Sequence, residues 1–198
     1  MHLIPLKKLV FTLAPAALMM ALMAALITLA HAHKAHEHGA AKVNIAVDGS
    51  QVNIALESPL DNLLPFEHSP VTLEQRKQVK DMAIRMHRET LFQLTPAAEC
   101  RLEKVTLASE VFDAALLDPN ISLDPDRADD EKGQSSKEGH GDLDAEFFFV
   151  CGKPENLNSV GILLFSAWPK MERIRVQAIT PRGQRSASLT PRRNQMKW

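Results

Sequence analysis

The sequence predicts an α+β protein, built on a mostly antiparallel sheet with one main amphipathic helix and a long acidic loop. Apolar residues alternate with polar ones on both sides of Asp48-Gly49, the pattern of a β-hairpin with a tight turn. Several further short runs have the same strand character, whereas helical spacing is sustained only over residues 73–88. Many strands and few helices favour an antiparallel sheet with a helix packed on one face.

The individual elements follow from local patterns. Alternating apolar residues predict hairpin strands at 42–47 and 52–56, and three prolines exclude long regular structure from residues 57–70. Thr72 and Gln75 have the spacing of a helix capping box, and the apolar stripe that follows includes Met82 and Met86, which we expect in the core. Further strands are predicted at 91–94, 101–107, 143–151, 160–165, 174–179 and 187–189, with a helical turn within 167–173.

The first 32 residues have the pattern of a secretory signal peptide. Lys7 and Lys8 precede a long uncharged run, and Ala30 and Ala32 provide the small residues of a cleavage site. Export would place the mature protein in the periplasm. Cleavage after Ala32 would leave His33 at the amino terminus, and cleavage after Ala30 would leave His31 there.

A retained inner-membrane anchor facing the periplasm is the competing interpretation of the same segment. Its apolar run approaches the length of a bilayer span, although Pro15 would interrupt a helix there. Residues 33–41 are small, polar and rich in histidine, which predicts a flexible arm. Residues 42–198 are long enough for a single domain with its own core, and residues 113–142 form a loop insertion in it.

Composition argues against a nucleic-acid partner. The 23 basic residues of the whole chain include Lys7 and Lys8 of the signal segment, and they stand against 24 acidic residues. The mature chain is therefore slightly negative, without the clustered positive charge that nucleic-acid binding requires. The arginines and lysine of residues 182–197 lack interleaved aromatic residues, and we expect a solvated terminus there.

Cys100 and Cys151 are the two cysteines of the chain, and both belong to the exported part. In an oxidising compartment such a pair normally forms a disulfide bond, and two free buried thiols are the alternative. A bond between them would close a loop of about 50 residues and stabilise the fold by about 4 kcal/mol in the chain-entropy model.

The histidine-rich arm is the first candidate metal site. His33, His36 and His38 fall within six residues, and imidazole is the commonest protein ligand for zinc. A merely polar linker is the competing interpretation. If the mature chain begins at His31, its free amine and the imidazole of His33 would instead suit the square-planar geometry of Cu(II) or Ni(II).

A second candidate site borders the acidic loop. His140 and Asp142 place a nitrogen and an oxygen ligand two residues apart where a strand begins. Glu67 and His68, between two prolines, could supply further ligands. Each of these residues, taken alone, also has an ordinary interpretation as a surface polar side chain. His87, beside the apolar stripe of the helix, is not expected to be a ligand.

Several motifs are distinctive in combination, namely His33–Gly39, the hairpin, Glu57–Leu63, Phe66–His68, Ala98–Cys100, His140–Phe147, Cys151 and Leu164–Pro169. Together they resemble the ZrgA-like family of periplasmic zinc-binding proteins, over essentially the whole mature chain. The resemblance implies export, zinc binding, and delivery of zinc to an uptake transporter under scarcity. Family members often carry a long histidine- and aspartate-rich insertion where this chain has residues 113–142, but here that stretch contains only His140, which argues against a high zinc capacity.

These observations favour a binding protein for Zn(II) or a similar divalent metal that assists a membrane transporter. The alternative is a non-catalytic structural or interaction protein of the cell envelope with incidental histidines. An enzyme is not expected, because the sequence contains no Gly-x-Ser-x-Gly, no HExxH and no phosphate-binding loop.

Overall fold

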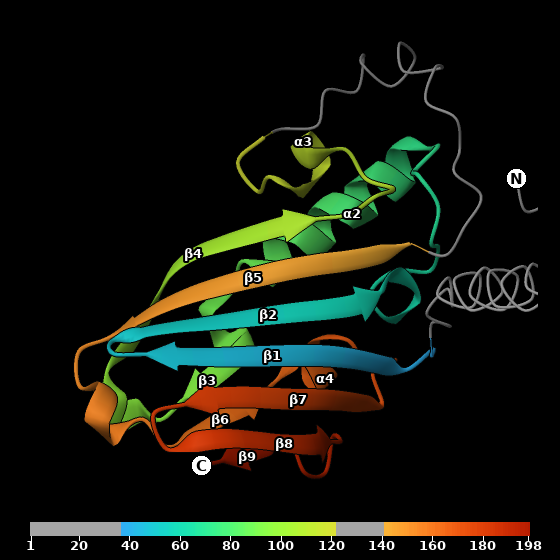
Figure 1. Ribbon diagram of the computed structural model, residues 1–198. Helices are drawn as coiled ribbons and strands as arrows, with labels where there is room; N and C mark the ends of the chain where they lie inside the picture. Colours follow the sequence, from blue (N-terminus) through green and yellow to red (C-terminus); the bar gives the residue numbers. More distant parts are fainter. Residues whose placement is uncertain (1–36, 122–140) are drawn as a thin grey trace, which may run out of the picture. The chain divides into compact units, whose positions relative to one another are not determined.

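The structure, a computed structural model, describes residues 37–121 and 141–198, and its main feature is a six-stranded sheet (Figure 1). The strands of this sheet are β1 (Ala40–Asp48), β2 (Gln51–Pro59), β4 (Cys100–Ala108), β5 (Asp142–Cys151), β7 (Arg173–Thr180) and β8 (Gly183–Leu189). Their order is β4-β5-β2-β1-β7-β8. All neighbours are antiparallel except β1 and β7, which are parallel, so the mostly antiparallel sheet is confirmed.

The hairpin of β1 and β2 forms where the sequence predicts it. Val43, Ile45 and Val52 point into the core, with at most 2 % of their surface exposed. The turn between the strands needs a positive φ angle, which Gly49 adopts at +55°. β1 begins at Ala40, so the predicted arm of residues 33–41 ends two residues earlier than expected.

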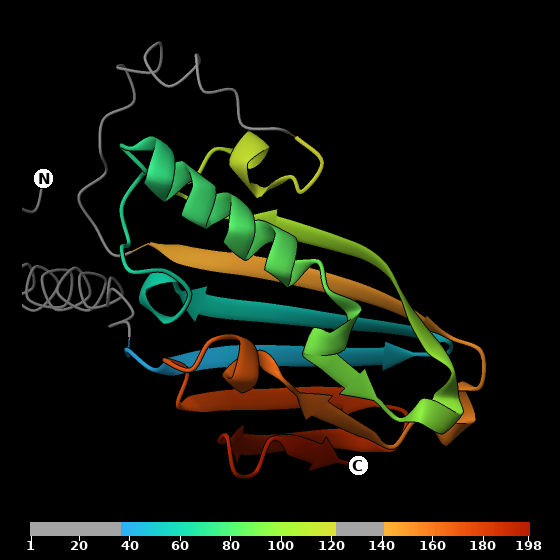
Figure 2. The ribbon, with the colours of Figure 1, turned by 180° about the vertical axis from the view of Figure 1, so that it is seen from behind.

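One face of the sheet is covered by the helices and by a second, smaller sheet (Figure 2). The helix α2 (Leu73–Met86) has the predicted capping box, in which the Thr72 side chain accepts from the Gln75 backbone and the Gln75 side chain accepts from Thr72. Val79, Met82 and Met86 of this helix are buried in the core, as expected. The smaller sheet has the order β3-β6-β9 and consists of β3 (Phe92–Leu94), β6 (Ser159–Ile162) and β9 (Gln195–Lys197).

Three local predictions are wrong. Residues 164–167 form the helix α4 (Leu164–Ala167) where we expected a strand at 160–165 and a helical turn only from 167. The basic terminus is not wholly solvated, because β9 pairs with β6 and buries Met196. Residues 113–142 are not loop throughout, because Asp113 caps the short helix α3 (Ala114–Leu117) and Leu117 is buried. Residues 122–140 of the predicted acidic loop lie outside the described residues, as do residues 1–36.

Cys100 and Cys151 form a disulfide bond, so the free-thiol alternative is wrong. The two residues face each other directly on β4 and β5. The bond therefore fastens the edge strand β4 to the rest of the sheet at the end where β4 begins.

Candidate metal centre

The connectivity of the sheet brings most of the predicted metal ligands to one of its ends. β1 and β7 begin at this end, where Ala40 pairs with Arg173, and β5 begins there opposite the end of β2, where Asp142 pairs with Pro59. In Figure 1 this is the end from which the β1 arrow starts. His38, in the described part of the arm, and the start of β5 are about 100 residues apart in the sequence, yet both lie at this end of the sheet.

The turn η2 (Leu60–Asn62), which follows β2 directly, links these two regions. The backbone N–H of Leu60 donates to the carbonyl oxygen of Gly141 at 2.9 Å. The buried Asn62 accepts a hydrogen bond from the Gly39 N–H at 2.9 Å and donates to the Ala40 carbonyl at 3.0 Å. One turn therefore fixes both the end of the arm and the start of β5.

Asp61, the middle residue of this turn, lies between a histidine and a lysine. The Nδ1 atom of His38 is 3.6 Å from one carboxylate oxygen, and the Nζ atom of Lys170 is 2.9 Å from the other. His38 and Asp61 thus place an imidazole nitrogen and a carboxylate oxygen side by side, which are ligand types that zinc accepts. The side chain of His38 is 57 % exposed, so an ion can reach it from solvent.

Glu67 and His68 lie in the loop that follows η2. The Nδ1 atom of His68 is 2.8 Å from the Ser69 carbonyl oxygen. Because a carbonyl can only accept, Nδ1 must carry the hydrogen in this contact, which leaves the lone pair on Nε2 for a metal. The ring also lies 5.3 Å from that of Phe66, and the side chain of His68 is exposed.

Gly141 holds the start of β5 against this loop. A Cβ atom at position 141 would lie only 2.9 Å from the carbonyl oxygen of Glu67 and 2.8 Å from a methyl group of Leu60. Only glycine permits such a close approach, and it places the residue before Asp142 directly against the backbone of Glu67. The backbone of Asp142 is held in turn by the Ser109 hydroxyl, which donates to its carbonyl at 2.7 Å.

The predicted ligands therefore fall into three groups. Glu67 and the exposed His68 lie in the loop whose backbone touches Gly141, the residue before Asp142. His38 lies beside Asp61 at the neighbouring turn. His33, His36 and His140 are outside the described residues. Within residues 37–121 and 141–198, no three His, Cys, Asp or Glu side chains are close enough together to hold a metal ion by themselves.

Sequence reasoning missed Asp61 and Lys170. Asp61 lies in the Glu57–Leu63 motif, but its contact with His38 depends on how β1 and β2 pair and cannot be read from local sequence. His87 was not expected to bind metal, and its Nδ1 atom is 2.8 Å from the Ala83 carbonyl of its own helix.

Carboxylates gather on β5 beside this end of the sheet. Partial burial raises the pKa of Asp144 above its ordinary value of 3.8, and the negative charges of Glu57, Asp142, Glu110 and Glu146 raise it further. Glu57 is the direct cross-strand neighbour of Asp144, so two like charges face each other. A local excess of negative charge attracts cations.

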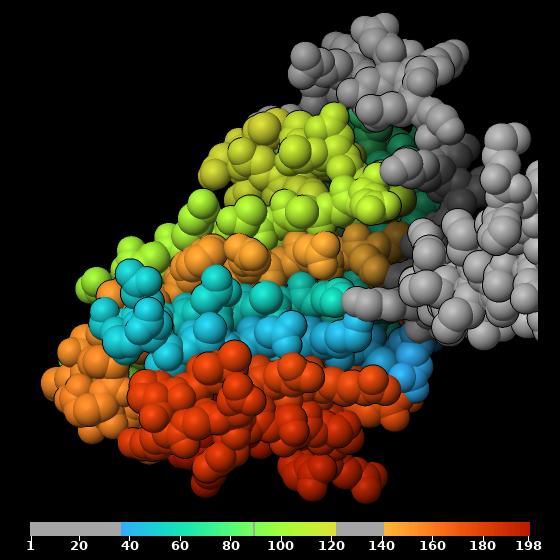
Figure 3. Space-filling view, viewed as in Figure 1, coloured from blue at the N-terminus to red at the C-terminus, as the bar shows by residue number. Residues whose placement is uncertain are grey.

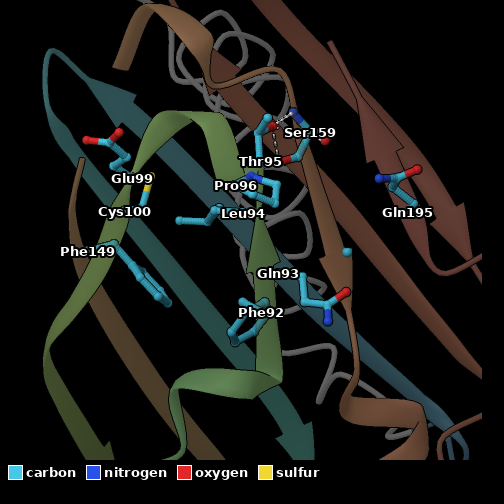
Figure 4. A pocket seen from close by; sticks show the side chains of 11 residues that line it. Phe92, Gln93, Leu94, Thr95, Pro96, Glu99, Cys100, Phe149, Ser159 and Gln195 are labelled. Carbon is cyan, nitrogen blue, oxygen red and sulfur yellow. Dashed lines mark hydrogen bonds between the residues drawn. The ribbon is translucent and has the colours of Figure 1, made fainter. Parts of the chain in front are cut away.

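A pocket of about 380 Å³ lies at the opposite end of the sheet, between β3 and the start of β4 (Figure 4). Phe92, Leu94 and Phe149 form its apolar part, and Gln93, Thr95 and Ser159 are among its polar residues. Its lining includes no histidine, and its one carboxylate, Glu99, pairs with Lys153. The pocket is therefore separate in position and chemistry from the predicted metal ligands.

Comparison with known families decides the class of protein. The family model described as "ZrgA family zinc uptake protein" matches residues 35–198. The chain belongs to the ZrgA family of zinc uptake proteins. This membership confirms the resemblance drawn from the motifs and supports a role in zinc acquisition. No curated protein sequence matches the chain significantly.

The match covers every described residue of the candidate metal centre, including the turn η2, the loop of Glu67 and His68, and the start of β5. It also begins at Ala35, before His36 and His38 of the arm. Among the described residues, no helix is both long and apolar enough to cross a membrane.

Proposed function

We propose that this ZrgA-family chain is a periplasmic protein that binds Zn(II) as cargo and passes it to an uptake transporter in the inner membrane. The observation that carries the proposal is the meeting of the arm, η2, the Glu67–His68 loop and the start of β5 at one end of the sheet. Family membership supports the zinc part of the proposal.

His38 and Asp61 form the fixed half of the proposed site. Zinc normally takes four ligands from nitrogen, oxygen and sulfur atoms. The described residues supply two at this turn, and His33 and His36 are the nearest histidines in the sequence that could complete the set. Glu67, His68, Asp142 and His140 would form a second group of ligands on the other side of η2.

Binding at such a site is readily reversible, which suits a protein that must release its cargo. Protonation of an imidazole nitrogen competes with metal binding at that nitrogen. Lys170 adds a second competitor, because its ammonium group binds one carboxylate oxygen of Asp61 at 2.9 Å. Zinc must displace this ammonium group to use both carboxylate oxygens.

The same proposal includes export of the chain and a role without catalysis. Cleavage of the signal segment after Ala30 or Ala32 would leave the histidine-bearing arm at the mature amino terminus. No step of the proposed role requires a nucleophile or a general base, and we propose a binding protein rather than an enzyme.

Zinc titration by calorimetry of the mature, tag-free chain tests the site. Replacing His33, His36 and His38 with alanine should lower the number of zinc ions bound, because the variant lacks the imidazoles of the arm. The matched control is His87→Gln, which removes a histidine whose Nδ1 atom contacts the Ala83 carbonyl of its own helix. Unchanged zinc stoichiometry and affinity in the triple variant would exclude the arm from the mechanism.

A further inference from the structure

The outer face of the six-stranded sheet has no covering layer among the described elements. The helices α2 and α4 and the smaller sheet all lie on the inner face (Figure 2), while Figure 3 shows the outer face from the side of Figure 1. The strand order places three strands on each side of the seam between β2 and β1, namely β4-β5-β2 and β1-β7-β8.

Charges on this face change sign across that seam. The strand registers place Asp144, Glu57, Lys42 and Arg175 in one row across β5, β2, β1 and β7. Two acidic residues therefore occupy one half of the row and two basic residues the other half. Their distances from the seam match, because neighbouring strands are evenly spaced at about 4.8 Å.

Apolar side chains on the same face are arranged symmetrically about the seam. Four residues further along each strand, the registers place Phe148, Asn53, Ala46 and Ile179 in a second row. Phe148 on β5 and Ile179 on β7 are thus equally far from the seam. Ile179, the next-to-last residue of β7, is 60 % exposed.

We propose that two copies of this chain associate through their outer sheet faces, about a two-fold axis that runs along the strands at the β2–β1 seam. Such a rotation places β5 of one copy over β7 of the other. Asp144 then faces Arg175 of the second copy, and Phe148 faces Ile179 of the second copy. Acidic groups of each copy therefore face basic groups of the other, and apolar groups face apolar groups, as an isologous interface requires.

The charges within one copy are consistent with this pairing. Glu57 already binds Lys42 at 2.6 Å, so the two residues nearest the seam are neutralised in each copy. Asp144 lies beyond them as the direct cross-strand neighbour of Glu57, and a second copy would bring it a guanidinium group. Arg175 is 3.5 Å from Glu37, but Glu37 also binds Arg173, so this side of the face stays net positive.

The size of the face suits a modest, specific interface. Six strands at about 4.8 Å spacing and about seven residues of length give roughly 700 Å² per copy. A standard protein interface buries about 800 Å² per partner, so the area is near the lower part of the stable range. Two sheets that pack face to face align their strands within about 30°, which a two-fold axis along the strands allows.

Sedimentation of the mature, tag-free protein tests the proposal through charge reversal. The wild-type chain should show a monomer–dimer equilibrium that weakens with added salt. Asp144→Lys alone and Arg175→Glu alone should each weaken dimerisation by about tenfold or more, because each creates two like-charge contacts across the axis. An equimolar mixture of the two variants should dimerise again, because both contacts in the mixed dimer are then attractive.

The control variant is Glu74→Lys, an exposed charge reversal on α2, on the opposite side of the sheet. It should leave the dimer unchanged, and thermal unfolding should show that all variants are folded. A wild-type chain that is monomeric at all concentrations would overturn the proposal. Single variants that dimerise as strongly as the wild-type chain would also overturn it. So would an equimolar mixture of the two variants that does not dimerise. None of these outcomes depends on zinc.

Discussion

Asp61 offers its two carboxylate oxygens to different partners, His38 and Lys170. At the scale of single residues this contact explains how one site can both bind and release a cation. The histidine–carboxylate pair attracts zinc, and the ammonium group of Lys170 competes for the same carboxylate.

Replacing Lys170 with glutamine should therefore raise the zinc affinity. The change removes a positive charge 2.9 Å from Asp61, and the gain should be several-fold, about 1 kcal/mol, since the pair is partly exposed. Competition with a fluorescent zinc chelator measures it. Lys153→Gln, which breaks the surface pair with Glu99 at the other end of the sheet, is the control and should change nothing. Equal affinities in both variants would mean that Lys170 does not compete with the metal.

Asp144 should destabilise the fold at neutral pH. Its pKa is higher in the folded chain than in the unfolded chain, so the folded state holds the proton more tightly, and stability falls as the pH rises through the interval above 3.8. Asp144→Asn should then raise the free energy of unfolding of the monomer, measured at a dilution where the proposed dimer is dissociated, at pH 7 by about 0.5 kcal/mol, the scale of one cross-strand like-charge pair. The gain should disappear at a pH below 3.8, where both states are protonated. Urea unfolding at the two pH values is the measurement, and a gain that persists in acid would point to a cause other than charge.

At the scale of elements, the turn η2 matters most, because it joins three segments that are distant in sequence. The buried side chain of Asn62 makes three hydrogen bonds, to Gly39, Ala40 and Ser58. Removing it leaves the part-buried backbone N–H of Gly39 and carbonyl of Ala40 without this partner.

Asn62→Ala should lower the free energy of unfolding by about 1–3 kcal/mol. It should also weaken zinc binding, because His38 is no longer held beside Asp61. Asn156→Ala is the matched control, since Asn156 is exposed and donates one hydrogen bond to Ala97. This variant should lower the free energy of unfolding by less and leave zinc binding intact. Denaturant unfolding combined with zinc titration separates the two effects. Normal zinc binding in a destabilised Asn62→Ala chain would remove η2 from the site.

Local sequence patterns predict the helices and strands that neighbouring residues in the chain determine. The hairpin of β1 and β2 follows from alternation and from a glycine at the turn, and α2 follows from its capping box and apolar stripe. The helix α4 was missed because the apolar run at Leu163–Phe165 fits a strand equally well. The strand β9 was missed because three residues form a strand only through distant pairing with β6.

The grouping of the candidate site could not be predicted in this way. Histidine and carboxylate types single out His38, Glu67, His68 and Asp142 as candidate ligands, and their role in metal binding stays a prediction. The parallel pairing of β1 with β7 and the contact between Leu60 and Gly141 decide that grouping, and both are long-range.

At the scale of the whole molecule, the two ends of the sheet differ in character. The disulfide bond between Cys100 and Cys151 and the pocket beside it lie at one end, and the predicted zinc ligands among the described residues lie at the other. The covalent bond fixes the sheet without involving these ligands. No described element covers the outer face between the ends, where we propose that a second copy binds.

Elemental analysis of tag-free protein, secreted naturally and purified from the periplasm, tests the central claim most directly. The proposed function predicts zinc bound to the purified chain, or taken up when zinc is supplied at micromolar concentration. A chain that emerges without metal and binds no zinc under that supply would contradict it.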